Sequence, residues 1–386
     1  MYPAKKLSEI CEIVNWWTPD TWNSSYWDGD ILWITPKDMW KLEDIYVSDT
    51  FRKITEQWLK NSSTKLFPQN SIILSSRAPI WHLAINTVPM CTNQGCKWLI
   101  SWKDLDAKYL YYFLLNSVDL LNSLWTGTTF KELSSTKLKE IQIPLPPLST
   151  QTSIVARLDS AMAEIDEARR QTESALASAR EVWESTLESV FAGGEEGWEE
   201  KTFDEVCEIS SKLIDPKEKQ YQELLHIWWA NIESVTGKLL DLKTAKEEKL
   251  ISGKFLFDEN IVLYSKIRPY LIKVARPDFE GLCSADIYPL SPKKNLLHKD
   301  FLYYLLISAS FTEYAIKWSA RAGMPKVNRE HLFAYTFNLP SLPEQSRIVA
   351  HLDAVRAETE SLERLYTEKL ASLDELRRSV LEEAFS

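Results

Sequence analysis

The sequence predicts an α+β protein. Two similar mixed α/β domains are expected, separated by two long helices that form an antiparallel coiled coil, as a pseudo-twofold internal repeat. One observation is a fifteen-residue block, 145–159, that returns at 339–353 with nine identical positions. A second is that a long run with heptad spacing follows each copy, and short strand-like and helix-like runs precede it. We therefore expect four parts, which are 1–149, 150–194, 195–343 and 344–386.

The repeat extends beyond this block. LSEICEIV at 7–14 matches FDEVCEIS at 203–210, and NSIILSSRAPI at 70–80 matches NIVLYSKIRPY at 260–270. A period of this length indicates a duplicated domain rather than a solenoid repeat. An old duplication without functional symmetry is one interpretation. The connecting helices are duplicated too, however, and this favours a protein that presents two similar surfaces.

Each domain is expected to contain both strands and helices. Short β-branched or aromatic runs bounded by Asn, Pro and Ser predict strands, at 71–76, 82–85, 260–266 and 270–275. Longer apolar runs predict helices, at 107–124 and 299–317. These helices carry two aromatic pairs that are repeat mates, Tyr111-Tyr112 and Tyr303-Tyr304.

The long helical segments begin after Gln151 and Gln345. Apolar and small residues then follow a 4-3 spacing over about five heptads in each copy, with Lys369 as a break. The expected seam includes Ile154, Leu158, Ala161, Ile165, Val182, Leu352, Val355, Leu362, Leu373 and Leu376. Each helix could instead pack only on its own domain. Helices of about 40 residues, however, reach roughly 60 Å, further than a small domain is wide. The second helix must run back along the first, so we expect an antiparallel pair.

Charge is distributed unevenly. The net charge is −10, but residues 159–200 carry −9 and residues 353–386 carry −4, which leaves the rest at +3. The two domains are therefore weakly basic and able to meet phosphates, while the helices are acidic. The five cysteines lack the spacing of a zinc site, and we expect reduced thiols in a cytoplasmic protein. No apolar run is long enough to span a membrane or serve as a signal peptide.

The sequence contains no recognisable catalytic motif. Gly-x-Gly-x-x-Gly, the phosphate-binding loop and Gly-x-Ser-x-Gly are all missing, and the five histidines have no metal-ligand spacing. The nearest approach to a nuclease site is Asp241 with Glu247, Glu248 and Lys249. These residues lie in a charge run that is better explained as a solvated loop or helix face. We expect no active site and no metal or cofactor in this chain.

An ordered set of motifs resembles one family over essentially the whole chain. The motifs are the Pro-rich blocks running into Gln-x-x-Ile-Val-Ala-x-Leu-Asp, the loop at 18–35, SSRAPI at 75–80, NQGC at 93–96, GTTFKELS at 127–134 and NIESVTGKLL at 231–240. The chain resembles the specificity (S) subunit, HsdS, of type I restriction–modification systems.

The resemblance implies two target recognition domains that each read one half of a split, asymmetric sequence in double-stranded DNA. The long helices would be the spacers that set the gap and dock two methyltransferase (M) subunits. The S subunit has no activity of its own. S-adenosylmethionine, ATP and Mg²⁺ would belong to the M subunits and to the restriction/translocase (R) subunits.

Base reading requires donors and acceptors on loops held by a rigid scaffold. Such residues occur at nearly matching places in the two domains. Arg77 and Arg268 each follow one of the two matching predicted strands and precede a proline. The candidates in the first domain are Thr35, Lys37, Ser75, Ser76, Arg77, Asn93, Gln94, Thr128, Thr129 and Lys131. Those in the second are Asn231, Lys266, Arg268, Tyr270, Arg321, Lys326 and Asn328. Each of them alone could be an ordinary surface polar group.

One feature departs from the family pattern. The chain has 16 Trp and only 10 Gly, and tryptophan stands at several positions where the family has glycine. These are Trp16, Trp17, Trp81, Trp98, Trp125, Trp228, Trp229 and Trp318. Either these loops differ from those of the family, or the chain as written departs from the natural protein there. We favour the second explanation and give these side chains no functional role, and an intact-mass measurement decides between the two.

Two other functions compete with DNA reading. The chain could be a non-catalytic adaptor, with two protein-binding domains on a coiled-coil strut. A self-sufficient nuclease or methyltransferase is a third possibility, but no motif supports it. Preference for one duplex over random DNA distinguishes the first function from both alternatives.

Overall fold

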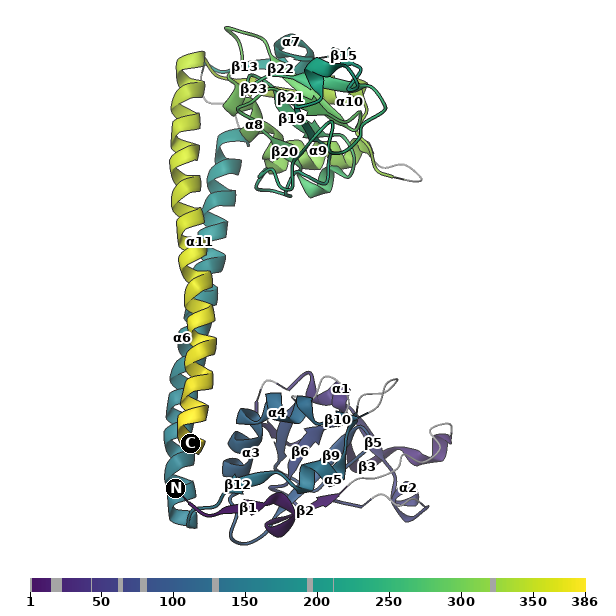
Figure 1. Cartoon of the computed structure of the whole chain (residues 1–386), viewed down its shortest axis with the longest axis vertical. Coiled ribbons are helices and arrows are strands. Elements are labelled where there is room, and N and C mark those ends of the chain that lie inside the picture. The colour runs from purple at the N-terminus through teal and green to yellow at the C-terminus, as the bar shows by residue number, and fades with distance from the viewer. Residues whose placement is uncertain are drawn as a thin grey trace. The chain divides into compact units, whose positions relative to one another are not determined.

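A computed structural model describes residues 2–14, 23–42, 44–61, 65–76, 82–126, 132–192, 197–210, 212–319 and 324–386, with backbone only at 125, 126 and 132. The chain divides into two compact units. Unit 1 comprises residues 1–172 and 368–386, and unit 2 comprises residues 173–367. Each unit therefore contains one mixed domain together with a stretch of both long helices (Figure 1).

Unit 1 is built around a five-stranded sheet with the order β2-β9-β6-β7-β4. Its strands are β2 (Cys11–Val14), β9 (Cys96–Ser101), β6 (Ile72–Ser75), β7 (Leu83–Asn86) and β4 (Tyr46–Val47). A smaller sheet has the order β5-β3-β8, from β5 (Arg52–Ile54), β3 (Trp27–Ile34) and β8 (Cys91–Thr92). Two further pairs join β1 (Ala4–Lys6) to β12 (Gln142–Pro144) and β10 (Trp125–Thr126) to β11 (Glu132–Leu133).

Helices cover this sheet because β6 is apolar on both faces. Ile72 and Leu74 pack against α3 on one side, and Ile73 packs with Trp98 and Met39 on the other. The helices of the domain are α1 (Pro36–Met39), α2 (Glu56–Asn61), α3 (Ala107–Asn116), α4 (Val118–Ser123) and α5 (Ser135–Lys139), with short 3-10 turns at Leu7–Glu9 and Ser24–Tyr26.

Unit 2 repeats the plan. The order β2-β9-β6-β7 recurs as β14-β22-β19-β20, from β14 (Cys207–Ile209), β22 (Ile287–Pro292), β19 (Val262–Ser265) and β20 (Val274–Ala275). A second sheet has the order β15-β18-β21-β16-β17, from β15 (Leu213–Ile214), β18 (Lys254–Phe257), β21 (Gly281–Cys283), β16 (Leu225–Ile227) and β17 (Lys243–Thr244). The pair of β13 (Glu199–Thr202) with β23 (Thr336–Leu339) corresponds to β1 with β12. The duplication inferred from sequence is thus confirmed at the level of topology.

The helices of this domain are α7 (Phe203–Val206), α8 (Lys299–Ile307), α9 (Ala309–Ser319) and α10 (Arg329–Phe333), with 3-10 turns at Lys219–Tyr221 and Pro269–Leu271. Both predicted domain helices are interrupted by a serine. The Ser117 hydroxyl donates to Phe113 O, and the Ser308 hydroxyl donates to Leu305 O, which satisfies carbonyls at a helix end. The strand predicted at 270–275 is wrong over its first half, because a 3-10 turn occupies residues 269–271.

The two long helices are α6 (Leu148–Phe191) and α11 (Leu342–Phe385), each of 44 residues. They contact each other antiparallel, as Figure 1 shows. In unit 1, Arg377 bonds Asp166 at 3.3 Å and Arg169 pairs with Asp374. In unit 2, Arg180 lies 3.6 Å from Glu363. All three pairs lie on one register, in which each step along α6 matches an equal step back along α11.

The seam follows the prediction in part. Leu158, Ile165 and Leu352 are buried, while Ile154 and Val355 are partly buried against the domain cores. Leu362 and Leu373 are also partly buried.

Two positions differ from the expected seam. Leu376 is 47% exposed, and its repeat mate Val182 is 53% exposed. Trp183, one residue after Val182, is buried instead, and Arg377, one residue after Leu376, bonds Asp166 on α6. The reason is that a nearly straight helix makes one turn every 3.6 residues. A face with a 3.5-residue repeat therefore rotates gradually away from the partner helix.

All five cysteines are buried and free. Burial raises the pKa of Cys11 and of its repeat mate Cys207 to about 12, so both thiols stay uncharged. The expectation of unpaired thiols is confirmed. Within the described ranges, no helix is long and apolar enough to cross a membrane.

Candidate nucleic-acid interface and its anchors on the long helices

A buried glutamine anchors each long helix to its domain. Gln151 accepts a hydrogen bond from Asp106 N at 2.8 Å and donates to Asp104 O at 2.9 Å and Pro146 O at 2.8 Å. Gln345 makes the same three bonds, with His298 N at 2.7 Å, Leu296 O at 2.9 Å and Pro340 O at 2.8 Å. Both side chains are fully buried. The first residue of the repeated Gln-x-x-Ile-Val-Ala-x-Leu-Asp motif therefore fastens the helix start to the domain.

The last residue of the motif makes a second anchor, two turns further on. Asp159 accepts from Lys108 Nζ at 2.8 Å and from the Tyr112 hydroxyl at 2.6 Å. In unit 2 its repeat mate, Asp353, accepts from Arg276 at 2.8 Å and from the Tyr304 hydroxyl at 2.5 Å. Burial raises the pKa of both tyrosines, and the aspartate bond raises it further, so they remain protonated donors.

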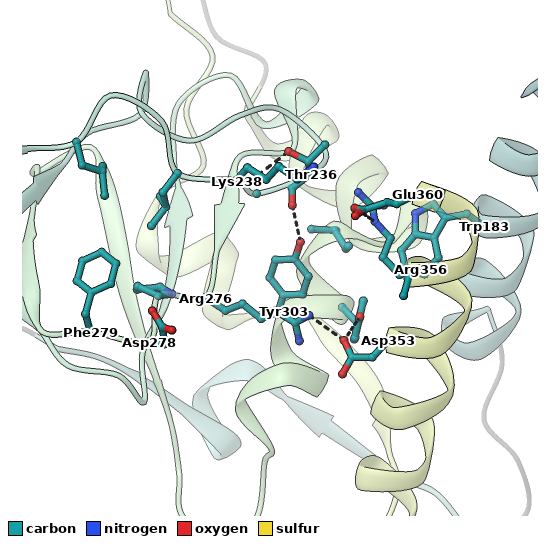
Figure 2. Close-up of a pocket in the computed structure, with 17 residues that line it drawn as sticks. Trp183, Thr236, Lys238, Arg276, Asp278, Phe279, Tyr303, Asp353, Arg356 and Glu360 are labelled. Carbon is teal, nitrogen blue, oxygen red and sulfur yellow. Dashed lines mark hydrogen bonds and ion pairs between the residues drawn. The ribbon is translucent and has the colours of Figure 1, made fainter. Parts of the chain in front are cut away.

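The cation of this anchor comes from different elements in the two units. Lys108 lies on α3, whereas Arg276 follows β20 and also bonds Asp300 at 2.8 Å. Figure 2 shows Arg276 bonded to the Asp353 carboxylate of α11, and both residues line a cavity of about 670 Å³. Arg356 lies above Trp183 on the far side, with its guanidinium carbon 4.8 Å from the ring centroid.

In unit 1 several predicted residues converge on one edge of the domain. Gly95 approaches α1 so closely that a Cβ there would lie 2.8 Å from Pro36 Cγ. On its other side Gly95 O accepts from Ser76 N at 2.8 Å. The turn that carries Asn93 and Gln94 therefore lies between α1 and the end of β6.

These residues differ in exposure. Lys37 is exposed, and Thr35, Asn93 and Gln94 are half-buried. Thr35 caps α1 through Asp38, and Asn93 Oδ1 accepts from Gly95 N at 2.9 Å. Ser75 and Ser76 are buried, so they support the turn rather than face solvent. Arg77, Thr128, Thr129 and Lys131 lie outside the described residues.

In unit 2 the predicted residues gather at the turn after β19. Arg268 N donates to Pro325 O at 2.9 Å, and Val327 N donates to Lys266 O at 2.9 Å. These bonds bring Lys266 and Arg268 next to Lys326. Tyr270, on the same turn, is 51% exposed. Lys326 is exposed and Arg268 is partly exposed, whereas the Lys266 side chain is 13% exposed and its ammonium group donates to Ala285 O. The result is a cationic and aromatic edge on a scaffold of strands, in which Lys266 lies behind the others.

Two lysines lie close together at this edge. Burial lowers the pKa of Lys266, and the nearby charge of Lys326 lowers it further. An anion placed between two such ammonium groups would relieve the repulsion. A DNA phosphate is an anion of this kind, and its neutralisation by lysine and arginine drives much of protein–DNA affinity.

Two predicted residues of unit 2 have structural partners. Asn231 is buried and donates to Leu240 O at 3.0 Å, while its Oδ1 accepts from Trp228 N at 3.0 Å. Asn328 caps α10, because its Oδ1 accepts from His331 N at 2.8 Å. Both therefore shape the loops of this edge. Arg321 lies outside the described residues.

The tryptophans at family-glycine positions are accommodated in different ways. Trp98 is buried and stacks on Phe67 with ring centroids 4.2 Å apart. Trp228 and Trp318 are 42% and 41% exposed. Among the described residues with a left-handed φ, none is Trp98, Trp228, Trp229 or Trp318. Trp16, Trp17, Trp81 and the side chain of Trp125 lie outside the described residues.

The acidic run at 241–249 forms a structural turn. Glu247 accepts from Thr244 N at 2.8 Å, and Glu248 Oε2 lies 2.7 Å from Nδ1 of the buried His226. Glu247 thus has its partner within the turn, and Glu248 has its partner on β16. Among the described residues no group of three or more His, Cys, Asp or Glu side chains is placed to hold a metal ion.

The His226–Glu248 pair predicts a pH dependence. Burial lowers the pKa of His226, although Glu248 opposes this shift. The unfolded chain then binds a proton more readily than the folded one, so unit 2 should lose stability as pH falls below about 6.5. We expect His226→Asn to reduce this loss of stability at low pH, as measured by urea unfolding between pH 5 and 7.5. His351→Asn, at an exposed position on α11, is the control. If the His226 variant lost as much stability at low pH as the wild type, the assignment would be contradicted.

Comparison with known proteins identifies the family. A sequence model described as the type I restriction modification DNA specificity domain matches residues 2–173 and again residues 195–370. The two matches together cover most of the chain, once for each repeat. The chain belongs to the type I restriction–modification specificity family. It is a DNA specificity subunit, non-catalytic in itself, of a type I restriction–modification system.

Relatives of this HsdS chain include the EcoDI specificity subunit of Escherichia coli, 27% identical over 73% of the chain and 70% of the relative. The MjaIX specificity subunit of Methanocaldococcus jannaschii is 33% identical over 69% of the chain and 66% of the relative. The HsdS subunit of Thermoanaerobacter tengcongensis has the same fold, with a TM-score of 0.60 at 19% identity over 100% of the chain and 96% of that subunit. A chain from a type I assembly structure aligns with a TM-score of 0.75, again at 19% identity, over 100% and 97% of the two chains.

The anchors on the long helices were missed as functional residues in the sequence. Part of the signal was present, because the aspartates end the repeated motif and the tyrosine pairs are repeat mates. Lys108 and Arg276 gave no signal, since they are not repeat mates and only the fold brings them to equivalent carboxylates.

Proposed function

We propose that this specificity subunit reads a bipartite, asymmetric target in double-stranded DNA. The domain at 1–149 would read one half and the domain at 195–343 the other, with 150–194 and 344–386 as spacers. The observation that carries the proposal is the cationic edge after β19, where exposed Lys326 and partly exposed Arg268 lie in front of Lys266. Strand β6 of unit 1 occupies the same place in its sheet as β19 in unit 2, and it leads into the edge with Lys37 and Asn93.

The long helices support the proposed docking of two methyltransferase subunits. A groove of about 410 Å³ lies between α6 and α11 in unit 2 and is lined by small or apolar residues such as Ala175, Ala179 and Leu362. Exposed Val182 borders it, and exposed Leu376 is its repeat mate in unit 1. Apolar side chains left in solvent at two equivalent places favour two copies of a helical partner. S-adenosylmethionine would then bind the M subunits, and ATP and Mg²⁺ the R subunits.

The test is a binding measurement on the S subunit with its methyltransferase subunits. We expect one bipartite duplex, selected from a random pool, to bind at least a hundredfold more tightly than scrambled DNA. Affinity should fall steeply as salt rises, because phosphate contacts release counterions. Arg268→Ala should weaken the preference for one half-site only. Equal binding to all duplexes in the pool would refute DNA reading and favour the adaptor.

A further inference from the structure

The edge of unit 2 rests on two loops with strained backbone. Residues 268–272, here called the reading turn, begin and end in the left-handed region, with φ of 49° at Arg268 and 47° at Ile272. Residues 233–238, here called the anchor loop, contain Val235 with φ of 69°. Left-handed backbone is costly for any residue with a Cβ and is rare for β-branched ones. Such strain persists only where the surroundings enforce it.

The two loops enforce each other's position. Val235 N donates to Ile272 O at 3.1 Å, so the left-handed residues of the two loops are bonded directly. Leu271 N and Ile272 N close the reading turn on Arg268 O at 2.9 Å and Pro269 O at 3.0 Å. The orientation of Arg268 and Tyr270 is therefore tied to the anchor loop.

The anchor loop is held in turn from the side of the long helices. The Tyr303 hydroxyl donates to Thr236 O at 3.1 Å, as Figure 2 shows. Gly237 fits beneath it, since a Cβ there would lie 2.3 Å from Val274 O and 3.0 Å from Tyr303 Oη. Tyr303 packs beside Tyr304, which bonds Asp353 on α11. A continuous set of contacts thus leads from the spacer helix to the reading turn.

We propose that Val235 and Tyr303 are positioning residues for DNA reading by unit 2. They touch no base themselves and hold the reading turn so that Arg268 and Tyr270 meet the DNA in one fixed orientation. This inference rests on the proposed function. It gives a role to a valine at a position where glycine would be relaxed, because the bond between Val235 and Ile272 restricts the turn.

The test uses the complex with methyltransferase subunits and three duplexes: the selected target, and the target with either half-site scrambled. Arg268→Ala identifies which half-site unit 2 reads. Tyr303→Phe removes one hydroxyl and keeps the ring, and we expect the preference for that half-site to fall about tenfold. Preference for the other half-site and the salt dependence should not change. Val235→Gly should lower the same preference with an equal or higher Tm, because glycine relieves the strain.

Two controls match these variants. Tyr111→Phe removes the hydroxyl of the repeat mate in unit 1, where burial is similar. Asn295→Gly relaxes another positive φ, of 65°, in unit 2. Both should bind like the wild type. Unchanged discrimination in both positioning variants, or equal losses at both half-sites, would overturn the inference and leave the proposed function standing. A wild-type complex that prefers neither half-site would overturn the proposed function itself, and this inference with it.

Discussion

One heptad inserted into each long helix is expected to lengthen the gap between the two half-sites by about three base pairs. Seven residues add about 10 Å to a helix, and base pairs are stacked about 3.4 Å apart. The half-sites themselves should stay the same, because the cationic edges lie on the domains and not on the helices. The original target should then lose most of its specific affinity, a loss on the order of a thousandfold.

The register of the helix pair shows where to insert. Asp166–Arg377, Arg169–Asp374 and Arg180–Glu363 lie on one antiparallel register, in which the bond after Thr172 faces the bond after Leu370. Insertion of seven residues at both points keeps the ion-pair partners opposite each other. Seven residues rotate a helix by about 20° less than two full turns, so the helix faces stay almost aligned. Variants of wild-type length with exposed substitutions at both points are the control. Selection from a random pool measures the result. Altered half-sites or an unaltered gap would refute the proposal that the domains read the half-sites and the helices set the gap.

Gln345→Leu is expected to destabilise unit 2 by about 4 kcal/mol, which is a large loss for a single substitution. Leucine fills similar space but leaves His298 N, Leu296 O and Pro340 O without the partner they have in the folded protein. A buried unpaired polar group costs more free energy than a formed hydrogen bond contributes. Gln151→Leu should destabilise unit 1 by the same reasoning.

Urea unfolding followed by circular dichroism measures the change. Gln171→Leu is the matched control, because Gln171 is exposed on α6 and bonds only Glu167 on the same helix among the described residues. Its effect should stay within about 0.5 kcal/mol. If Gln345→Leu were no more harmful than the control, the glutamine would not be an anchor.

Prediction from sequence succeeded where the signal is local or repeated. The strands at 71–76 and 260–266, the long helices and the duplication follow from periodicity and composition, and β6, β19, α6 and α11 occupy those places. It was less accurate where a tertiary contact competes with local pattern. Tyr270 and Leu271 were predicted as part of a strand, yet they belong to a 3-10 turn that begins at Pro269. The backbone bonds of Arg268 and Ile272 to neighbouring segments outweigh the strand propensity of the run.

The cationic edge illustrates the same limit. Lys266, Arg268 and Lys326 were selected as polar residues on loops, and the bonds after β19 bring them together. The sequence could not distinguish them from Asn231, whose amide is used within its own loop. The difference depends on which partners lie within hydrogen-bond distance once the chain has folded.

The sequence by itself determined the duplication, the two long helices and the family, because each depends on patterns that repeat along the chain. The tertiary structure decided which seam residues turn inward, since helix twist moves Leu376 and Val182 to the surface and Trp183 inward. It also decided which cation meets each aspartate anchor. Lys108 and Arg276 come from unrelated points of the two repeats, and only three-dimensional proximity can make them equivalent.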